Sequence, residues 1–177
     1  LEHCPDDIQI AVLDDVLAVT TADATVVISV PIEIGPPLAA KQGARALVAL
    51  GGVSAYASRE RYRPDLVVIN GENAAHGFGI TEDIFLDLMA AGADAVTLGN
   101  HAFDQREALV FIVREDRLVR PINWPAGCPG AGSALIETEG GRRVLVINAM
   151  GRVMVEPQLD DPFAAVDRAL DSCKLGR

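Results

Sequence analysis

Short apolar runs alternate with polar, glycine-containing loops along this chain, and the length of each run predicts a β-strand. The clearest run spans residues 66–70, and its unbroken hydrophobicity is typical of a parallel strand buried on both faces. Further strands are predicted at residues 8–13, 25–34, 93–98, 117–120, 133–138 and 143–148. The last two flank the sequence Glu-Gly-Gly-Arg, a turn signal that predicts a β-hairpin.

Helices are predicted between several of these strands. The segment at 38–50 is rich in Ala and Leu and ends at a pair of glycines, which favours a helix. Thr81 is placed to cap a second helix, because Glu82 and Asp83 in the first turn complement the helix dipole. Two more helices are predicted at about residues 104–113 and 162–173. This alternation of strands and helices predicts a right-handed, parallel α/β unit.

Polar residues follow two successive strands of this unit. Glu72 and Asn73 come shortly after the first strand, and Asn100 and His101 come after the second. Ligand sites of open α/β sheets gather at the carboxyl ends of the strands. We therefore expect one carboxylate, two amides and one imidazole to converge at this edge of the sheet.

Each of these side chains has a functional and a structural interpretation. Glu72 is placed to bridge two divalent cations, to be a carboxylate solvated in the loop, or to cap the next helix. The amide oxygen of Asn100 suits Mn or Fe, and His101 can donate a proton near neutral pH. The structural alternative is that Asn100 caps a helix and His101 lies on the surface. If Asp104 caps that helix instead, Asn100 is free to bind a metal. Asn73 is a metal ligand, a donor to the substrate or a residue that only stabilises the loop.

The composition narrows the range of partners. The chain has 15 Lys and Arg against 25 Asp and Glu, a formal charge of −10, which argues against stable binding to nucleic acid or to an anionic membrane surface. A small phosphorylated substrate stays compatible, because a metal or a helix N-terminus can hold a phosphate locally. The apolar runs are shorter than the roughly 18 residues that a membrane span needs. The 3 cysteines form no CxxC pair, as expected of ordinary thiols in the cytoplasm.

Five ordered stretches carry a more specific signal. They are INGENAAHGFGIT at 69–81, TLGNH at 97–101, RPINWP with CPG at 120–130, VINAMGR at 146–152 and LDDPF at 159–163. Through these stretches, residues 59–165 resemble the YmdB-like family of bacterial metallophosphoesterases, which act as cyclic-nucleotide phosphodiesterases. The resemblance implies a partial metallophosphoesterase-type α/β sandwich with parallel strands, helices and a β-hairpin.

The resemblance also implies a chemistry for the two polar loops. Two divalent metal ions, iron or manganese, would hold the phosphate of a 2′,3′-cyclic mononucleotide and generate the attacking hydroxide. Glu72 would bridge the two metals, and Asn73 and Asn100 would be ligands. His101 would protonate the leaving oxygen.

The chain departs from the family pattern at both ends. The family opens with a strand that ends in a metal-ligating Asp, but residues 50–53 contain none, and the candidate is Asp15, which follows the predicted strand at 8–13. The family also continues with a stretch that carries three metal-ligating histidines, and this chain stops before it. We therefore expect residues 1–177 to form a single, incomplete domain, with an atypical segment at 1–58 and a family-like region at 59–177.

Two functions are compatible with these departures. The chain is part of a metal-dependent phosphodiesterase, or it is a degenerate, non-catalytic module that binds a nucleotide or a partner protein. An incomplete parallel sheet would also present an unpaired edge, which predicts self-association into homo-oligomers.

Overall fold

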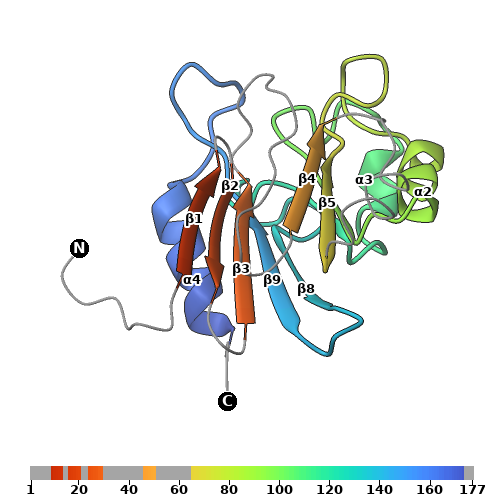
Figure 1. The fold of residues 1–177 in the computed structure, drawn as a ribbon. Coiled ribbons are helices and arrows are strands. Elements are labelled where there is room, and N and C mark those ends of the chain that lie inside the picture. Colours follow the sequence, from red (N-terminus) through yellow and green to blue (C-terminus); the bar gives the residue numbers. More distant parts are fainter. Residues whose placement is uncertain (1–8, 14–15, 21–23, 30–45, 51–64, 174–177) are drawn as a thin grey trace.

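The fold is described by a computed structural model that covers residues 9–13, 16–20, 24–29, 46–50 and 65–173 (Figure 1). Two β-sheets lie face to face, and helices cover their outer sides. No helix among the described residues is long and apolar enough to cross a membrane.

The first sheet carries the two polar loops. Its described strands are all parallel, and their order is β4 (Ala46–Leu50), β5 (Leu66–Asn70), β6 (Ala95–Thr97) and β7 (Leu118–Val119). Helices α2 (Glu82–Ala90) and α3 (Ala108–Phe111) lie on its outer side (Figure 1). The predicted cap is confirmed, because the side chain of Thr81 accepts a hydrogen bond from the backbone N–H of Ile84.

The second sheet is mixed. Its strands are β1 (Gln9–Leu13), β2 (Val16–Thr20), β3 (Ala24–Ser29), β9 (Arg143–Asn148) and β8 (Ser133–Glu137), in this spatial order. Strands β3 and β9 are parallel, and the other neighbours are antiparallel, including the predicted β8–β9 hairpin. Helix α4 (Pro162–Ser172) packs through Val166 and Ala169 against Leu145 and Ile147 of β9.

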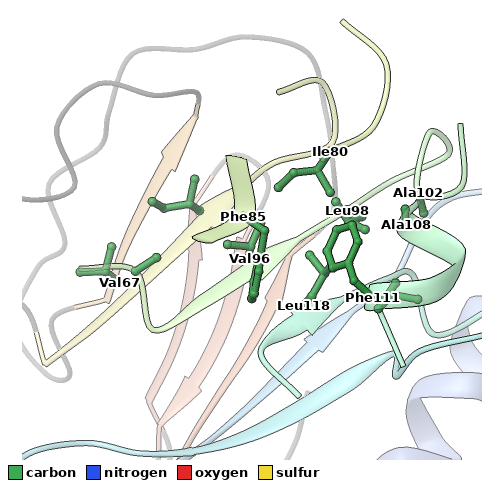
Figure 2. Packing of buried hydrophobic residues seen from close by; sticks show 12 residues of the cluster. Val67, Ile80, Phe85, Val96, Leu98, Ala102, Ala108, Phe111 and Leu118 are labelled. Carbon is green, nitrogen blue, oxygen red and sulfur yellow. The ribbon is translucent and has the colours of Figure 1, made fainter. Parts of the chain in front are cut away.

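Strand β5 shows why the molecule is a sandwich. Its residues alternate between two apolar layers. Val67 and Ile69 belong to the cluster that includes Phe85 of α2 (Figure 2). Leu66 and Val68 belong to a second cluster, which lies between the sheets and includes residues of β8 and β9. The predicted α/β sandwich with parallel strands, helices and a hairpin is therefore confirmed.

Two predicted helices need correction. Residues 46–50, part of the helix predicted at 38–50, form strand β4 and pair in parallel with β5; residues 38–45 lie outside the described residues. The sequence of a short apolar run does not show whether it forms a strand or a helix. Here the pairing with β5 makes residues 46–50 a strand. The helix predicted at 104–113 is reduced to α3, because the chain from 101 to 107 forms successive turns.

The strand predictions differ from the structure in the N-terminal region. Strand β2, which begins shortly after the strand predicted at 8–13, was not predicted. It pairs with both β1 and β3, and this cross-strand pairing stabilises a segment whose sequence alone gives a weak signal. Of the strand predicted at 25–34, residues 25–29 belong to β3 and the rest lie outside the described residues.

The cluster in Figure 2 supplies the first prediction. Phe85 is fully buried on α2 and packs against Phe111 of α3 with ring centroids 6.1 Å apart, whereas the next residue, Leu86, is half-exposed. Replacing Phe85 by Ala should lower the free energy of unfolding by about 3–5 kcal/mol, because a cavity opens beneath both helices. Leu86→Ala, the control on the same helix, should cost less than about 1 kcal/mol. Urea unfolding followed by circular dichroism measures both; equal losses would contradict this placement of the core.

Candidate active site

The loops after β5 and β6 lie against each other at one edge of the first sheet. The backbone N–H of Gly71 donates to the carbonyl of Thr97 over 2.9 Å, which continues the pairing of the two strands into the loops. The side-chain oxygen of Asn70 accepts from the N–H of Glu72 over 2.9 Å and shapes the first turn. The expected convergence of the two loops is therefore present.

Glu72 is a buried carboxylate at this junction. Its Oε1 accepts a hydrogen bond of 2.9 Å from the backbone N–H of Asn100. Burial raises the pKa of the Glu72 carboxyl above its ordinary value, and the nearby Asn100 and His101 oppose part of this rise. Glu72 is thus neither a solvated loop residue nor the cap of α2, which is Thr81.

Gly99 makes room for this carboxylate. A Cβ atom at Gly99 would overlap with both carboxylate oxygens of Glu72 and with the carbon that joins them. The space is far smaller than van der Waals contact requires, so any other residue at this position would displace the carboxylate or the loop. The glycine of the GNH sequence is therefore required by the close approach of Glu72.

His101 is held by its neighbours at both ring nitrogens. Its Nδ1 lies 2.7 Å from Oδ2 of Asp104, and its Nε2 lies 3.2 Å from Nδ2 of Asn100. Since a carboxylate only accepts, Nδ1 carries a hydrogen, and Nε2 accepts from Nδ2 of Asn100 when the ring is neutral. The imidazole side chain is partly exposed.

Asp104 has a role that the sequence did not reveal. It was considered as the cap of a helix, but α3 begins at Ala108 and its N-cap residue, Glu107, makes no side-chain cap bond. Asp104 instead orients the imidazole of His101. The sequence did contain a signal for this contact: His101 and Asp104 are three residues apart, and a turn can bring two residues at this spacing together.

The other candidate residues lie differently. The side chain of Asn73 is exposed at the start of the loop, whose turn is closed by a hydrogen bond from Gly77 N–H to the Asn73 carbonyl. His76 is also exposed and has a positive φ of 56°. Asp15 lies outside the described residues. Glu72, Asn100 and His101 are thus brought together, and the roles of Asn73 and Asp15 as ligands stay predictions.

A buried side-chain amide from the second sheet forms hydrogen bonds to the backbone just before the GNH loop. Asn148, the last residue of β9, is fully buried, and its Nδ2 donates to the carbonyls of Leu98 and Val119, at 2.5 and 2.9 Å. It therefore links the chain just before Gly99 to the ends of β7 and β9. The sequence placed Asn148 in a family-like stretch but gave it no role.

Arg120 and Asn123 stabilise the loop at residues 120–130, which contains Pro121, Pro125 and Pro129. The guanidinium of Arg120 donates to the carbonyls of Pro121, Cys128 and Pro129, and burial lowers its pKa from the ordinary value. The amide of Asn123 bonds both to the backbone of Met150 and to the carbonyl of Asp160. Both side chains satisfy backbone groups, so their roles are structural.

The donor atoms fit part of a metal site. The carboxylate of Glu72 and the amide oxygen of Asn100 are of the type that binds Mn²⁺ and Fe²⁺. However, no group of three or more His, Cys, Asp or Glu within the described ranges is arranged to hold a metal ion. These residues are therefore of a type that can bind a metal ion, and the described residues do not form a complete metal site.

The fold and this edge of the sheet define an α/β protein of the metallophosphoesterase type. A solved structure of a novel phosphatase from Mycoplasma pneumoniae shares the fold with a TM-score of 0.57 and 28% sequence identity, over 66% of this chain and 43% of that one. A hypothetical protein from Thermus thermophilus is similar with a TM-score of 0.59 and 46% identity, over 64% of this chain and 44% of that one.

A family model described as YmdB-like protein matches residues 45–177, which is more than half of the chain. The chain therefore belongs to the YmdB-like family. It is 46% identical over 112 residues to a 2′,3′-cyclic-nucleotide 2′-phosphodiesterase from Bacillus subtilis, and the match covers 63% of this chain and 42% of that protein. The chain thus spans about two fifths of the length of this relative.

The contact between Gly99 and Glu72 supplies the second prediction. Gly99→Ala should lower the free energy of unfolding by about 1–3 kcal/mol, because the new methyl group has no room beside the buried carboxylate. The N–H of Asn100 should also exchange faster with solvent, since its acceptor is displaced. Gly151→Ala is the matched control, because a Cβ there meets nothing within 4 Å. Thermal unfolding and amide hydrogen exchange measure these effects; equal stability of the two glycine variants would disprove the steric argument.

Proposed function

We propose that this chain carries part of the active site of a metal-dependent phosphodiesterase that hydrolyses 2′,3′-cyclic mononucleotides. The observation that carries the proposal is the convergence of the Glu72 carboxylate, the Asn100 amide and the His101 imidazole at one edge of the parallel sheet. The 46% identity to the Bacillus 2′,3′-cyclic-nucleotide 2′-phosphodiesterase supports the choice of substrate.

The proposed metal ligands come from both loops. Glu72 would bridge two divalent cations, iron or manganese, and Asn73 and Asn100 would bind them through amide oxygens. When bound, two such cations neutralise the phosphate and lower the pKa of the attacking water. Asp15 is the proposed further acid. We propose that residues 1–177 are one incomplete domain, because the described ligands are too few and the chain spans about two fifths of its Bacillus relative.

His101 is the proposed proton donor. Opening of a 2′,3′-cyclic phosphate at its 2′ position leaves a ribose oxygen that must be protonated as its bond to phosphorus breaks. Asp104 holds the hydrogen of Nδ1, so Nε2 is the atom that delivers the proton. The Nδ2 of Asn100 lies 3.2 Å from the same nitrogen and donates to it only while Nε2 is unprotonated, so this contact would give way when Nε2 carries the proton for the leaving oxygen.

A second candidate is a degenerate module that binds a nucleotide or a partner protein without catalysis. The observation that favours it is the incomplete set of metal ligands within residues 65–173. Elemental analysis of the purified chain separates the two. Two tightly bound metals per chain would exclude the non-catalytic module, and a metal-free chain that takes up none would support it.

The third prediction concerns metal affinity. Glu72→Gln should lower the affinity for Mn²⁺ by about tenfold or more, because the amide keeps the shape of the carboxylate and the acceptor for Asn100 but loses its charge. Asp87→Asn, an exposed change on α2, is the control and should leave the affinity unchanged. Calorimetric titration with Mn²⁺ measures both; equal affinity of the Glu72→Gln variant and the wild type would remove Glu72 from the proposed ligands.

The fourth prediction concerns catalysis, measured on the longest form of the protein that its gene encodes. With Mn²⁺ present, it should release 3′-phosphates from 2′,3′-cyclic mononucleotides. His101→Asn should lower kcat by roughly 10²–10⁴-fold, because the leaving oxygen loses its proton donor.

His76→Asn is the matched control for this measurement, because His76 is exposed and Asn tolerates its positive φ. It should leave kcat close to the wild-type value. If the metal-loaded protein leaves cyclic nucleotides intact, or if both histidine variants behave alike, the proposed function is wrong.

A further inference from the structure

Phe78 is an aromatic residue that is exposed at the candidate active site. Its side chain is 56% exposed, and it belongs to none of the buried clusters formed by the described residues. Its ring stands edge-on to the imidazole of His101, with ring centroids 5.1 Å apart and planes at 90°. A hydrophobic core therefore does not explain the placement of this ring.

The backbone around Phe78 is nevertheless held in place. Its carbonyl accepts a hydrogen bond of 2.7 Å from the side chain of Gln105, which lies four residues after His101. Its N–H donates to the carbonyl of Ala75 over 3.1 Å. At the next residue, Gly79, a Cβ would lie 2.7 Å from the carbonyl oxygen of His101, so the two loops are in close contact there. The backbone that carries the exposed ring is thus fixed to the loop that carries the proposed proton donor.

The chemistry of the proposed substrate gives this position a use. In a 2′,3′-cyclic nucleotide, the base is attached to C1′, the carbon next to the one that bears the 2′-oxygen. When the 2′-oxygen lies at Nε2 of His101, the base must lie close to the same imidazole. An aromatic ring at this distance from His101 is within reach of the base, and every base offers a π-face for stacking.

We propose that Phe78 is a specificity-determining residue that stacks on the base of the bound cyclic nucleotide. This inference rests on the proposed function and adds the part of the substrate that Phe78 recognises. Because stacking makes no use of the edge of the base, it favours nucleotides over sugar phosphates and discriminates weakly among the bases.

The test compares 2′,3′-cyclic AMP with ribose 2′,3′-cyclic phosphate, which lacks the base, on the metal-loaded protein. Phe78→Ala should weaken the affinity for the nucleotide by roughly 5- to 100-fold and change the affinity for the base-free compound by less than about twofold. Phe78→Trp should retain the affinity for the nucleotide, and the fluorescence of the new indole should be quenched by the nucleotide and not by the base-free compound. Phe163→Ala, at an 81% exposed aromatic residue on α4, is the control and should change neither affinity.

The outcomes distinguish this inference from the proposed function. If both compounds bind and Phe78→Ala weakens both equally or neither, the base does not stack on Phe78, and the proposed function stands. If the wild type binds the nucleotide no better than the base-free compound, the inference fails in the same way. If the protein binds neither compound, both proposals are overturned.

Discussion

Burial of the Glu72 carboxylate between two strand ends is the constraint on which this site depends. A buried carboxylate loses its hydration and must be compensated by N–H groups or by cations. The backbone N–H of Asn100 supplies part of this compensation, and Gly99 supplies the space. The two loops must therefore approach closely, and the same approach brings Asn100 and His101 beside Glu72. The raised pKa of the Glu72 carboxyl shows that the neighbouring N–H groups and His101 offset only part of the cost of its burial.

The sandwich transmits this constraint to the rest of the fold. Asn148 lies on the second sheet and holds the carbonyls of Leu98 and Val119 on the first, so the residue before Gly99 is fixed by both sheets. Residues of both sheets also share one apolar layer, in which Val68 of β5 belongs to the same cluster as Val146 of β9. The loop that carries His101 is consequently anchored to both sheets, which fixes the position of the proposed proton donor.

The sequence predicted the parts whose signals are local. The unbroken apolar run of β5 and the capping residue Thr81 define their elements without help from distant residues, and the strand-end rule then places Glu72 and Asn100 at one edge. Strand β4 was predicted as a helix because only its pairing with β5 distinguishes the two. Asp104 and Asn148 were assigned no site role because their contacts depend on a turn and on a second sheet, neither of which periodicity reveals.

The described residues divide the site into two unequal parts. On the side of the proposed proton donor, Asp104, His101 and Asn100 form a continuous chain of contacts within five residues of sequence, so one turn of backbone sets the geometry. On the side of the proposed metal ligands, Glu72 belongs to no group of three or more His, Cys, Asp or Glu that could hold a metal ion among the described residues. The proposed proton donor is thus positioned by local structure, whereas the proposed metal site would need further ligands beyond those the described residues bring together. Because the proposed ligand Asn100 and the proposed proton donor His101 are consecutive residues, a phosphate held by metals at Asn100 would lie beside His101 without further rearrangement of its loop.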